Sequence, residues 1–254
     1  MKSLLKIPLL VAVATMMTCS FSACSDNDDP TPDTGTSETD AKFEAIAKQY
    51  LDHTVYVTYK NLADETEQLV KDLQALKSSK TDANVKATCE TFLEARAWWE
   101  KSEAFLYGAA TDFGIDPHID SWPLDLDGLQ TALKNTEQVE AMGGEDGDIY
   151  AGEKLGNSLL GFHGIEYILF EDGSPKSVSK ISDLHLTYAV AVAGDLRNRC
   201  WQLELSWRGE SAVNADRVAK VANELELPYT VNSGEYSYGE NMLCLLYTSP
   251  SPRD

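Results

Sequence analysis

Basic residues are scarce in this chain, which has 21 lysines and arginines against 41 aspartates and glutamates and a formal net charge of -20. Proteins bind nucleic acid through clustered lysine and arginine side chains, so this composition argues against nucleic acid as a partner. A negative field attracts cations instead. An acidic composition also serves solubility, so the charge favours a cation as ligand without identifying one.

Several familiar sequence patterns are missing. The chain has no strict alternation of apolar and polar residues, which marks β-strands, and no glycine-rich phosphate loop. It also has no Cys-x-x-Cys pair of the zinc-site type and no His-Glu-x-x-His helix of the zinc peptidases. These absences argue against a nucleotide site and a standard zinc site.

Apolar residues recur at steps of three and four along the chain. This spacing predicts an all-α fold, an antiparallel helical bundle. The connection 111–127 is rich in aspartate and holds two prolines, so we expect a shaped loop that packs Trp122 against the helices. The predicted helices are 41–76, 82–108, 128–142, 155–170, 182–208 and 212–225.

The N-terminus resembles an export signal, with Lys2 and Lys6 before an apolar run that is too short to span a bilayer. Phe21-Ser22-Ala23-Cys24 resembles a lipobox, so we interpret 1–24 as a lipoprotein signal peptide with Cys24 as the lipidated residue. Plain secretion is the alternative. The segment 25–40 is predicted to be a disordered acidic tether. We therefore expect an exported protein that is lipid-anchored to the outer membrane and exposed at the cell surface.

The last residues differ in character from the helical domain, which we assign to 41–243. Residues 244–254 resemble a translated sequencing-adapter read-through, which would make the domain C-terminally truncated; a natural polar tail is the alternative. Cys89 and Cys200 are then the cysteines of the folded part. An exported compartment permits a disulfide, but spacing does not decide whether these two pair.

The run 155–170 is almost entirely apolar, yet it contains His163 and Glu166. Residues three apart are neighbours on one face of a helix. A buried imidazole and carboxylate are costly unless they pair or bind a metal, so the pair is either a core hydrogen bond or two metal ligands. Gly161 and Gly164 each weaken a helix by about 1 kcal/mol. Their presence indicates the close approach of another backbone.

The predicted helix 82–108 has an apolar stripe in which Arg96 and Glu103 hold two positions, with Glu100 bordering the same face. Charged residues on a core-facing stripe are unusual. One interpretation is a buried Arg–Glu pair that fixes helix packing. The other is a carboxylate pair facing the pocket of the His163 helix. On the second interpretation, the metal ligands are His163, Glu166, Glu100 and Glu103, and the ion is divalent or ferric, iron or zinc.

Gly161-x-His163-x-x-Glu166 resembles the GxHxxE signature of the imelysin family. A second segment supports the resemblance through its supporting residues Arg96, Trp99, Asp120 and Trp122. The resemblance covers 41–243 and implies an incomplete imelysin-like helical domain, related to the peptidase-like domain of ferrous-iron uptake proteins. It implies a cell-envelope lipoprotein that binds a metal ion or a metal-bearing ligand in iron uptake.

Two alternatives stay open. The family's other name implies a metallopeptidase, but Gly164 and Tyr167 stand where a His-Glu-x-x-His helix has its base and second ligand. That departure argues against an enzyme. The other alternative is a non-catalytic module that recognises a surface protein.

Overall fold

The structure is a computed structural model that describes residues 38–106 and 108–225. Its first part is one long helical rod, made of α1 (Glu38–Tyr50), the π-helical turn η1 (Leu51–Val55) and α2 (Tyr56–Ser78). No glycine or proline interrupts this stretch, so no residue in it strongly opposes helix formation. The predicted helix 41–76 is therefore confirmed, although α1 begins inside the segment predicted as a tether.

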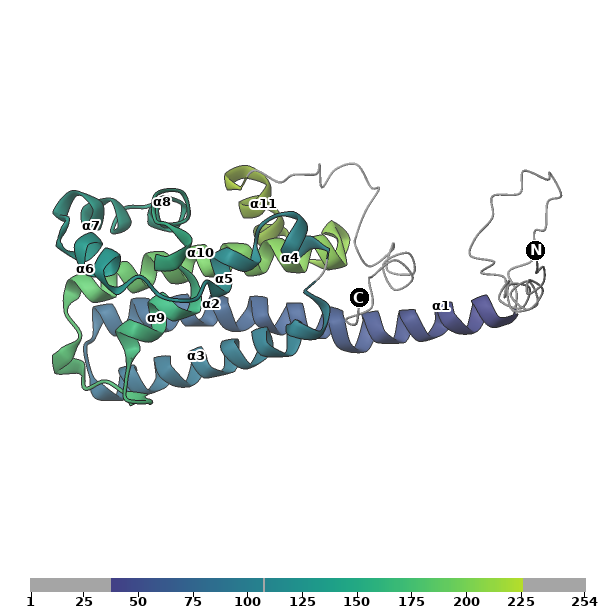
Figure 1. Cartoon of the computed structure of the whole chain (residues 1–254), viewed down its shortest axis with the longest axis horizontal. Helices are drawn as coiled ribbons and strands as arrows, with labels where there is room; N and C mark the ends of the chain where they lie inside the picture. The colour runs from purple at the N-terminus through teal and green to yellow at the C-terminus, as the bar shows by residue number, and fades with distance from the viewer. Residues whose placement is uncertain (1–37, 107, 226–254) are drawn as a thin grey trace, which may run out of the picture. The chain divides into compact units, whose positions relative to one another are not determined.

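Two further long helices pack on α2. After a short turn, α3 (Asp82–Ser102) runs back along α2, and α10 (Asp183–Arg208) lies against α2 as well (Figure 1). The hydroxyl of Thr81 caps α3 by accepting the N–H of Asn84. A capping box formed by Ser182 and His185 starts α10, which gives His185 a structural role.

Short helices and turns cover α10 and fill the space between α3 and α10 (Figure 1). These elements are η2 (Glu103–Phe105), α4 (Ala109–Asp112), α5 (Asp116–Asp120), α6 (Leu126–Lys134), α7 (Thr136–Met142), α8 (Gly147–Lys154), η3 (Asn157–Leu159), α9 (Gly161–Leu169), β1 (Phe170–Glu171), β2 (Ser174–Pro175) and η4 (Val178–Lys180). The strands β1 and β2 form a small antiparallel hairpin after α9, with Phe170 opposite Pro175.

Large aromatic side chains form the centre of the core. Tyr59 on α2 meets Phe105 edge-on at 5.4 Å between ring centroids and stacks on Trp207 of α10 at 5.9 Å. All three side chains are fully buried. This packing joins α2 and α10 to η2, the turn that follows α3, and the all-α fold is as predicted. Among the described helices, none combines the length and the apolar character needed to cross a bilayer.

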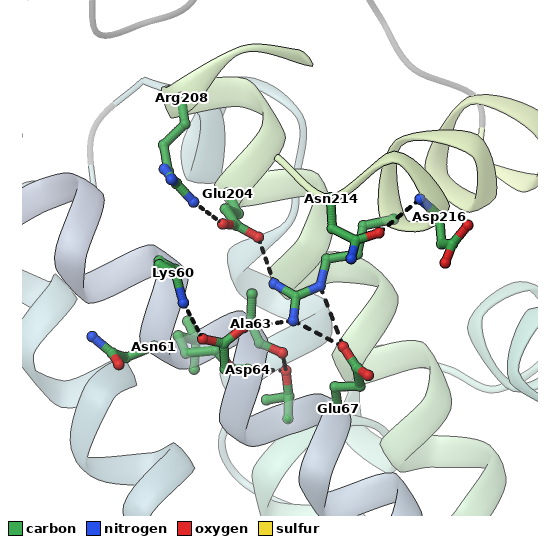
Figure 2. A network of polar contacts seen from close by, with 12 residues as sticks. Lys60, Asn61, Ala63, Asp64, Glu67, Glu204, Arg208, Asn214 and Asp216 are labelled. Carbon is green, nitrogen blue, oxygen red and sulfur yellow. Dashed lines mark hydrogen bonds and ion pairs between the residues drawn. The ribbon is translucent and has the colours of Figure 1, made fainter. Parts of the chain in front are cut away.

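After η5 (Glu210–Ala212), the last described helix, α11 (Ala215–Glu224), is held by ion pairs and by a small apolar cluster around Val221. Arg217 bonds Asp64 at 2.6 Å and Glu67 at 2.8 Å, both on α2, and Glu204 on α10 at 2.8 Å. Figure 2 shows these three acidic side chains converging on one point. Within α11, Val221 is the one residue buried in full, so the apolar contribution to docking is small.

Several predicted boundaries are wrong, for local reasons. The predicted helix 128–142 is two helices, because Asn135 ends α6 and its side chain caps α7. The segment 111–127 is not simply a loop: α5 forms there with Pro117 in its first turn, where a missing N–H costs nothing. Trp122 does not pack down, since 75% of it is exposed.

Cysteine chemistry is simple in the described part. Cys89 and Cys200 are buried free thiols, so the disulfide that the sequence left open does not form. Burial raises the pKa of the Cys89 thiol to about 12 and raises that of Cys200 further. The predicted signal peptide with Cys24, most of the tether and the predicted foreign tail lie outside the described residues.

Candidate functional site

The motif helix α9 is held against α5 by a glycine contact. Gly161 has a φ of +68°, and a Cβ at this position would lie 2.1 Å from the carbonyl oxygen of Ile119. Gly164 leaves room for Tyr188, whose hydroxyl would lie 2.5 Å from an added Cβ. The close backbone approach predicted from these glycines is confirmed. It places the first turn of α9 directly on the end of α5.

Asp120, at the end of α5, is the centre of the site. Its Oδ1 accepts a hydrogen bond from Arg96 Nη1 at 2.6 Å and lies 3.0 Å from His163 Nε2. Its Oδ2 accepts the indole N–H of Trp99 at 2.8 Å. The side chain is 14% exposed, so three partners from α3 and α9 satisfy a largely buried carboxylate. The contact between Asp120 Oδ1 and His163 Nε2 also favours the tautomer of His163 that carries its proton on Nε2.

The second ring nitrogen of His163 points to a different carboxylate. His163 Nδ1 lies 3.3 Å from Glu166 Oε2, one turn along α9. The His163 side chain is 16% exposed, whereas Glu166 is 53% exposed. The imidazole therefore bridges a buried carboxylate on one side and a solvent-facing one on the other.

Arg96 connects this site to the surface of α3. Its Nε donates to Glu100 at 2.6 Å, and its guanidinium lies 5.3 Å from the ring centroid of Phe162. Burial alone would lower the pKa of Arg96, but its bonds to Asp120 and Glu100 outweigh burial and raise the pKa. Arg96 therefore remains a fixed cation beside Asp120.

The predicted set of four buried ligands is not what the structure shows. Glu100 is exposed and pairs with Arg96, and Glu103 is exposed as well. The regular α-helix ends at Ser102, so Glu103 leaves the periodic stripe on which its burial was predicted. The buried carboxylate beside His163 is instead Asp120, which the motif had suggested only as a supporting residue.

A groove with a volume of about 480 Å³ opens beside His163 and Glu166. Trp122 forms one wall, and its ring centroid lies 4.8 Å from that of His163 with a 57° angle between the planes. Within 38–225, the described residues contain no group of three or more His, Cys, Asp or Glu side chains arranged to hold a metal ion. The groove is also lined by Phe92, Leu93, Leu124, Tyr167, Phe170, Glu171, Asp172 and Gly173.

A second His–Asp pair fastens the opposite side of α5. His118 Nδ1 lies 3.3 Å from Asp195 Oδ2 on α10, and the Asp195 side chain is 2% exposed. Gly152 is required here, because a Cβ would lie 2.2 Å from Asp195 Oδ1. Sequence reasoning missed this pair, since the two residues are far apart in the chain and belong to no short motif.

Comparisons with known proteins identify the family to which the chain is similar. A family model described as imelysin, peptidase family M75, matches residues 55–238. Iron-regulated protein A of Synechococcus elongatus is 31% identical over 163 residues, which are 64% of this chain and 40% of that protein.

Two solved structures share the fold. A protein from Parabacteroides distasonis, described as a candidate iron-regulated protein A precursor, has a TM-score of 0.60 at 24% identity and covers 84% of this chain and 57% of its own. An imelysin-like protein from Psychrobacter arcticum has a TM-score of 0.51 at 13% identity and covers 78% and 56%. The chain thus spans less than two thirds of the length of each relative.

Proposed function

This chain belongs to the imelysin family, and we propose that it takes part in iron acquisition at the cell envelope by binding a metal ion, or a metal-bearing ligand, at His163 and Glu166. The similarity to iron-regulated protein A supports an iron-related role in general. The proposal that a metal binds at His163 and Glu166 rests on the arrangement of one imidazole between two carboxylates.

The contact between His163 and Asp120 carries the proposal. Metal-binding histidines almost always donate their second ring N–H to a carboxylate or carbonyl, which fixes the tautomer. With Nε2–H directed at Asp120, the lone pair of Nδ1 is available on the side of Glu166. Asp120 is then the orienting group and not a ligand.

The donor pair fits an ion of the iron or zinc type. His163 Nδ1 and Glu166 Oε2 are 3.3 Å apart. Two donors that are each about 2.0–2.1 Å from an ion have about this separation at a near-tetrahedral angle. Imidazole and carboxylate together suit first-row metals. The two residues supply part of a coordination shell, and the metal-bearing ligand or water supplies the rest.

Calorimetric titration of the full chain with Zn²⁺, and with Fe²⁺ under anaerobic conditions, tests the proposal. We expect His163→Ala to weaken metal binding at least about tenfold, because losing even a residue that only orients a metal ligand typically costs about 10–100-fold in metal affinity. His185→Ala and Glu103→Gln are the controls and should bind normally, because neither side chain contacts the pair. Binding should also weaken as the pH falls, since the ligands must be deprotonated. Unchanged affinity in a His163→Ala, Glu166→Ala double variant would refute the metal site.

The envelope location is a separate part of the proposal. It rests on the lipobox-like Phe21-Ser22-Ala23-Cys24, which lies outside the described residues. Membrane fractionation of cells that express Cys24→Ala tests it. We expect the variant to leave the membrane fraction, and continued incorporation of labelled fatty acid into the variant would contradict the assignment of Cys24.

A further inference from the structure

We propose that the groove beside the motif binds a small organic cation with an apolar body, which stacks on Trp122 and pairs with the carboxylates of Glu166 and Asp172. The groove shares Glu166 with the metal site, but this binding does not require the metal. The proposal therefore stands or falls separately from the metal proposal.

The first observation is apolar surface that folding leaves exposed at this groove. Trp122 is 75% exposed and Leu93 is 56% exposed, and both line it. An aromatic side chain is a large apolar surface, and such surface left open around a cavity is typical of a binding site. Phe92, Tyr167 and Phe170 add partly or fully buried aromatic surface to the same groove. The groove thus offers ring faces to an apolar ligand.

The second observation is the sign of the charge. The charged residues that line the groove are Glu166, Glu171 and Asp172, and its lining includes no lysine or arginine. Lys180 pairs with Glu171 and neutralises it. Glu166 and Asp172 are left as exposed carboxylates at the groove. A carboxylate or phosphate ligand would be repelled here, whereas an ammonium or guanidinium group would be attracted.

The third observation is that aromatic rings of α9 already contact cations of the protein. Lys176 Nζ lies 4.8 Å from the ring centroid of Tyr167, and the Arg96 guanidinium lies 5.3 Å from that of Phe162. Cations are attracted to the faces of aromatic rings, and tryptophan is the strongest partner. Trp122 is therefore suited to the same interaction with a cation from outside the chain.

The size of the groove decides in favour of a small molecule. Its volume of about 480 Å³ falls in the range of about 300–1,000 Å³ that is typical of small-molecule sites. Aromatic walls with a few polar groups at the rim are also typical of such sites. A ligand of this volume can reach both Trp122 and the carboxylates that line the same cavity.

Calorimetry on the full chain, with three probes of similar size, tests the proposal. Benzyltrimethylammonium is the cationic probe, benzyl alcohol the neutral one and phenylacetate the anionic one. At low ionic strength we expect the cation to bind at least tenfold more tightly than either of the others. Trp122→Ala should lose this binding, Trp122→Phe should retain most of it, and Asp172→Asn should weaken it several-fold.

Leu126→Ala is the matched control, because Leu126 is 48% exposed but does not line the groove. It should bind the cation like the unchanged chain. Equal affinity for all three probes, or full affinity in a Trp122→Ala variant with an unchanged circular dichroism spectrum, would overturn the proposal. So would binding of a long basic peptide without binding of the small cation. Zn²⁺ titration of Trp122→Ala separates the two proposals, since the metal site should survive this change.

Discussion

Asp120 Oδ1 lies 3.0 Å from His163 Nε2, which makes a polar contact between the end of α5 and the first turn of α9. The same oxygen accepts a hydrogen bond from Arg96 on α3. One carboxylate therefore fixes the position of three helices and the protonated nitrogen of the imidazole. The chemistry of His163 depends on a residue 43 positions earlier in the chain.

We expect Asp120→Ala to destabilise the fold by about 2–4 kcal/mol, because it leaves a largely buried guanidinium without its main partner and orphans the indole N–H of Trp99. Urea denaturation followed by circular dichroism measures the change. Glu140→Ala, at an exposed site on α7, is the control and should lie within about 0.5 kcal/mol of the unchanged chain. A similar small change in Asp120→Ala would show that Arg96 finds another partner.

A second prediction concerns Gly161. Gly161→Ala should destabilise the chain by more than about 2 kcal/mol, since a left-handed backbone alone costs a non-glycine residue about 1–2 kcal/mol, and the added Cβ would meet the Ile119 carbonyl at 2.1 Å. The separation of α9 from α5 should also lower metal affinity. Thermal unfolding and metal titration measure the two effects.

Gly156→Ala is the matched comparison for that variant. Gly156 has a φ of -70°, and an added Cβ would meet no atom within 4 Å. This change should be neutral, or should stabilise the chain by about 0.4–1 kcal/mol, because alanine lowers the conformational entropy of the unfolded chain. Equal effects at the two glycines would mean that α9 can move away from α5 without cost.

The long helices and the starts of α3 and α10 could be predicted from the sequence because their signals are local. Apolar periodicity identified α2, α3 and α10, and Ser182 and the turn before Asp82 marked two helix starts. The tight contact at Gly161 could also be predicted, since a glycine in an apolar helix needs a packing reason. Each of these inferences uses residues within a few positions of one another.

The arrangement of the site could not be predicted, because it depends on contacts between distant segments. Periodicity assigned Glu103 to the core, but the helix tightens after Ser102 and the side chain turns to solvent. Hydrophobicity assigned Trp122 to the interior, yet it remains exposed beside His163. Asp120 and the His118–Asp195 pair gain their roles only when α5 lies between α3, α9 and α10.

A third prediction concerns the attachment of α11. Arg217→Met removes the bonds to Asp64, Glu67 and Glu204, and it leaves Glu204, which is 2% exposed, with Arg208 as its remaining partner (Figure 2). Since α11 buries little apolar surface, we expect its amide protons to exchange at least tenfold faster, while those of α3 are unchanged. Hydrogen exchange with mass spectrometry measures this. Unaltered exchange in α11 would show that Val221 and its neighbours suffice to hold the helix.

Acid should release α11 before it unfolds the long helices. Burial raises the pKa of Asp64, Glu67 and Asp148, but hydrogen bonds from the cations Lys60, Lys71, Arg217 and Lys220, and from Asn198, outweigh it, so all three pKa values are lowered.

A carboxylate with a lowered pKa in the folded state contributes stability that is present above its unfolded pKa, about 3.9 for aspartate and 4.3 for glutamate, and that is lost as the pH falls through the folded value. Because α11 supplies Arg217 and Lys220 to these carboxylates, its protection from hydrogen exchange should fall below about pH 4 while α2 and α3 remain protected. Lys220→Met should move this loss to higher pH, because it removes one cation that lowers the pKa of Asp148. Simultaneous loss of protection in α11 and α3 would instead mean that α11 and the long helices unfold as one unit.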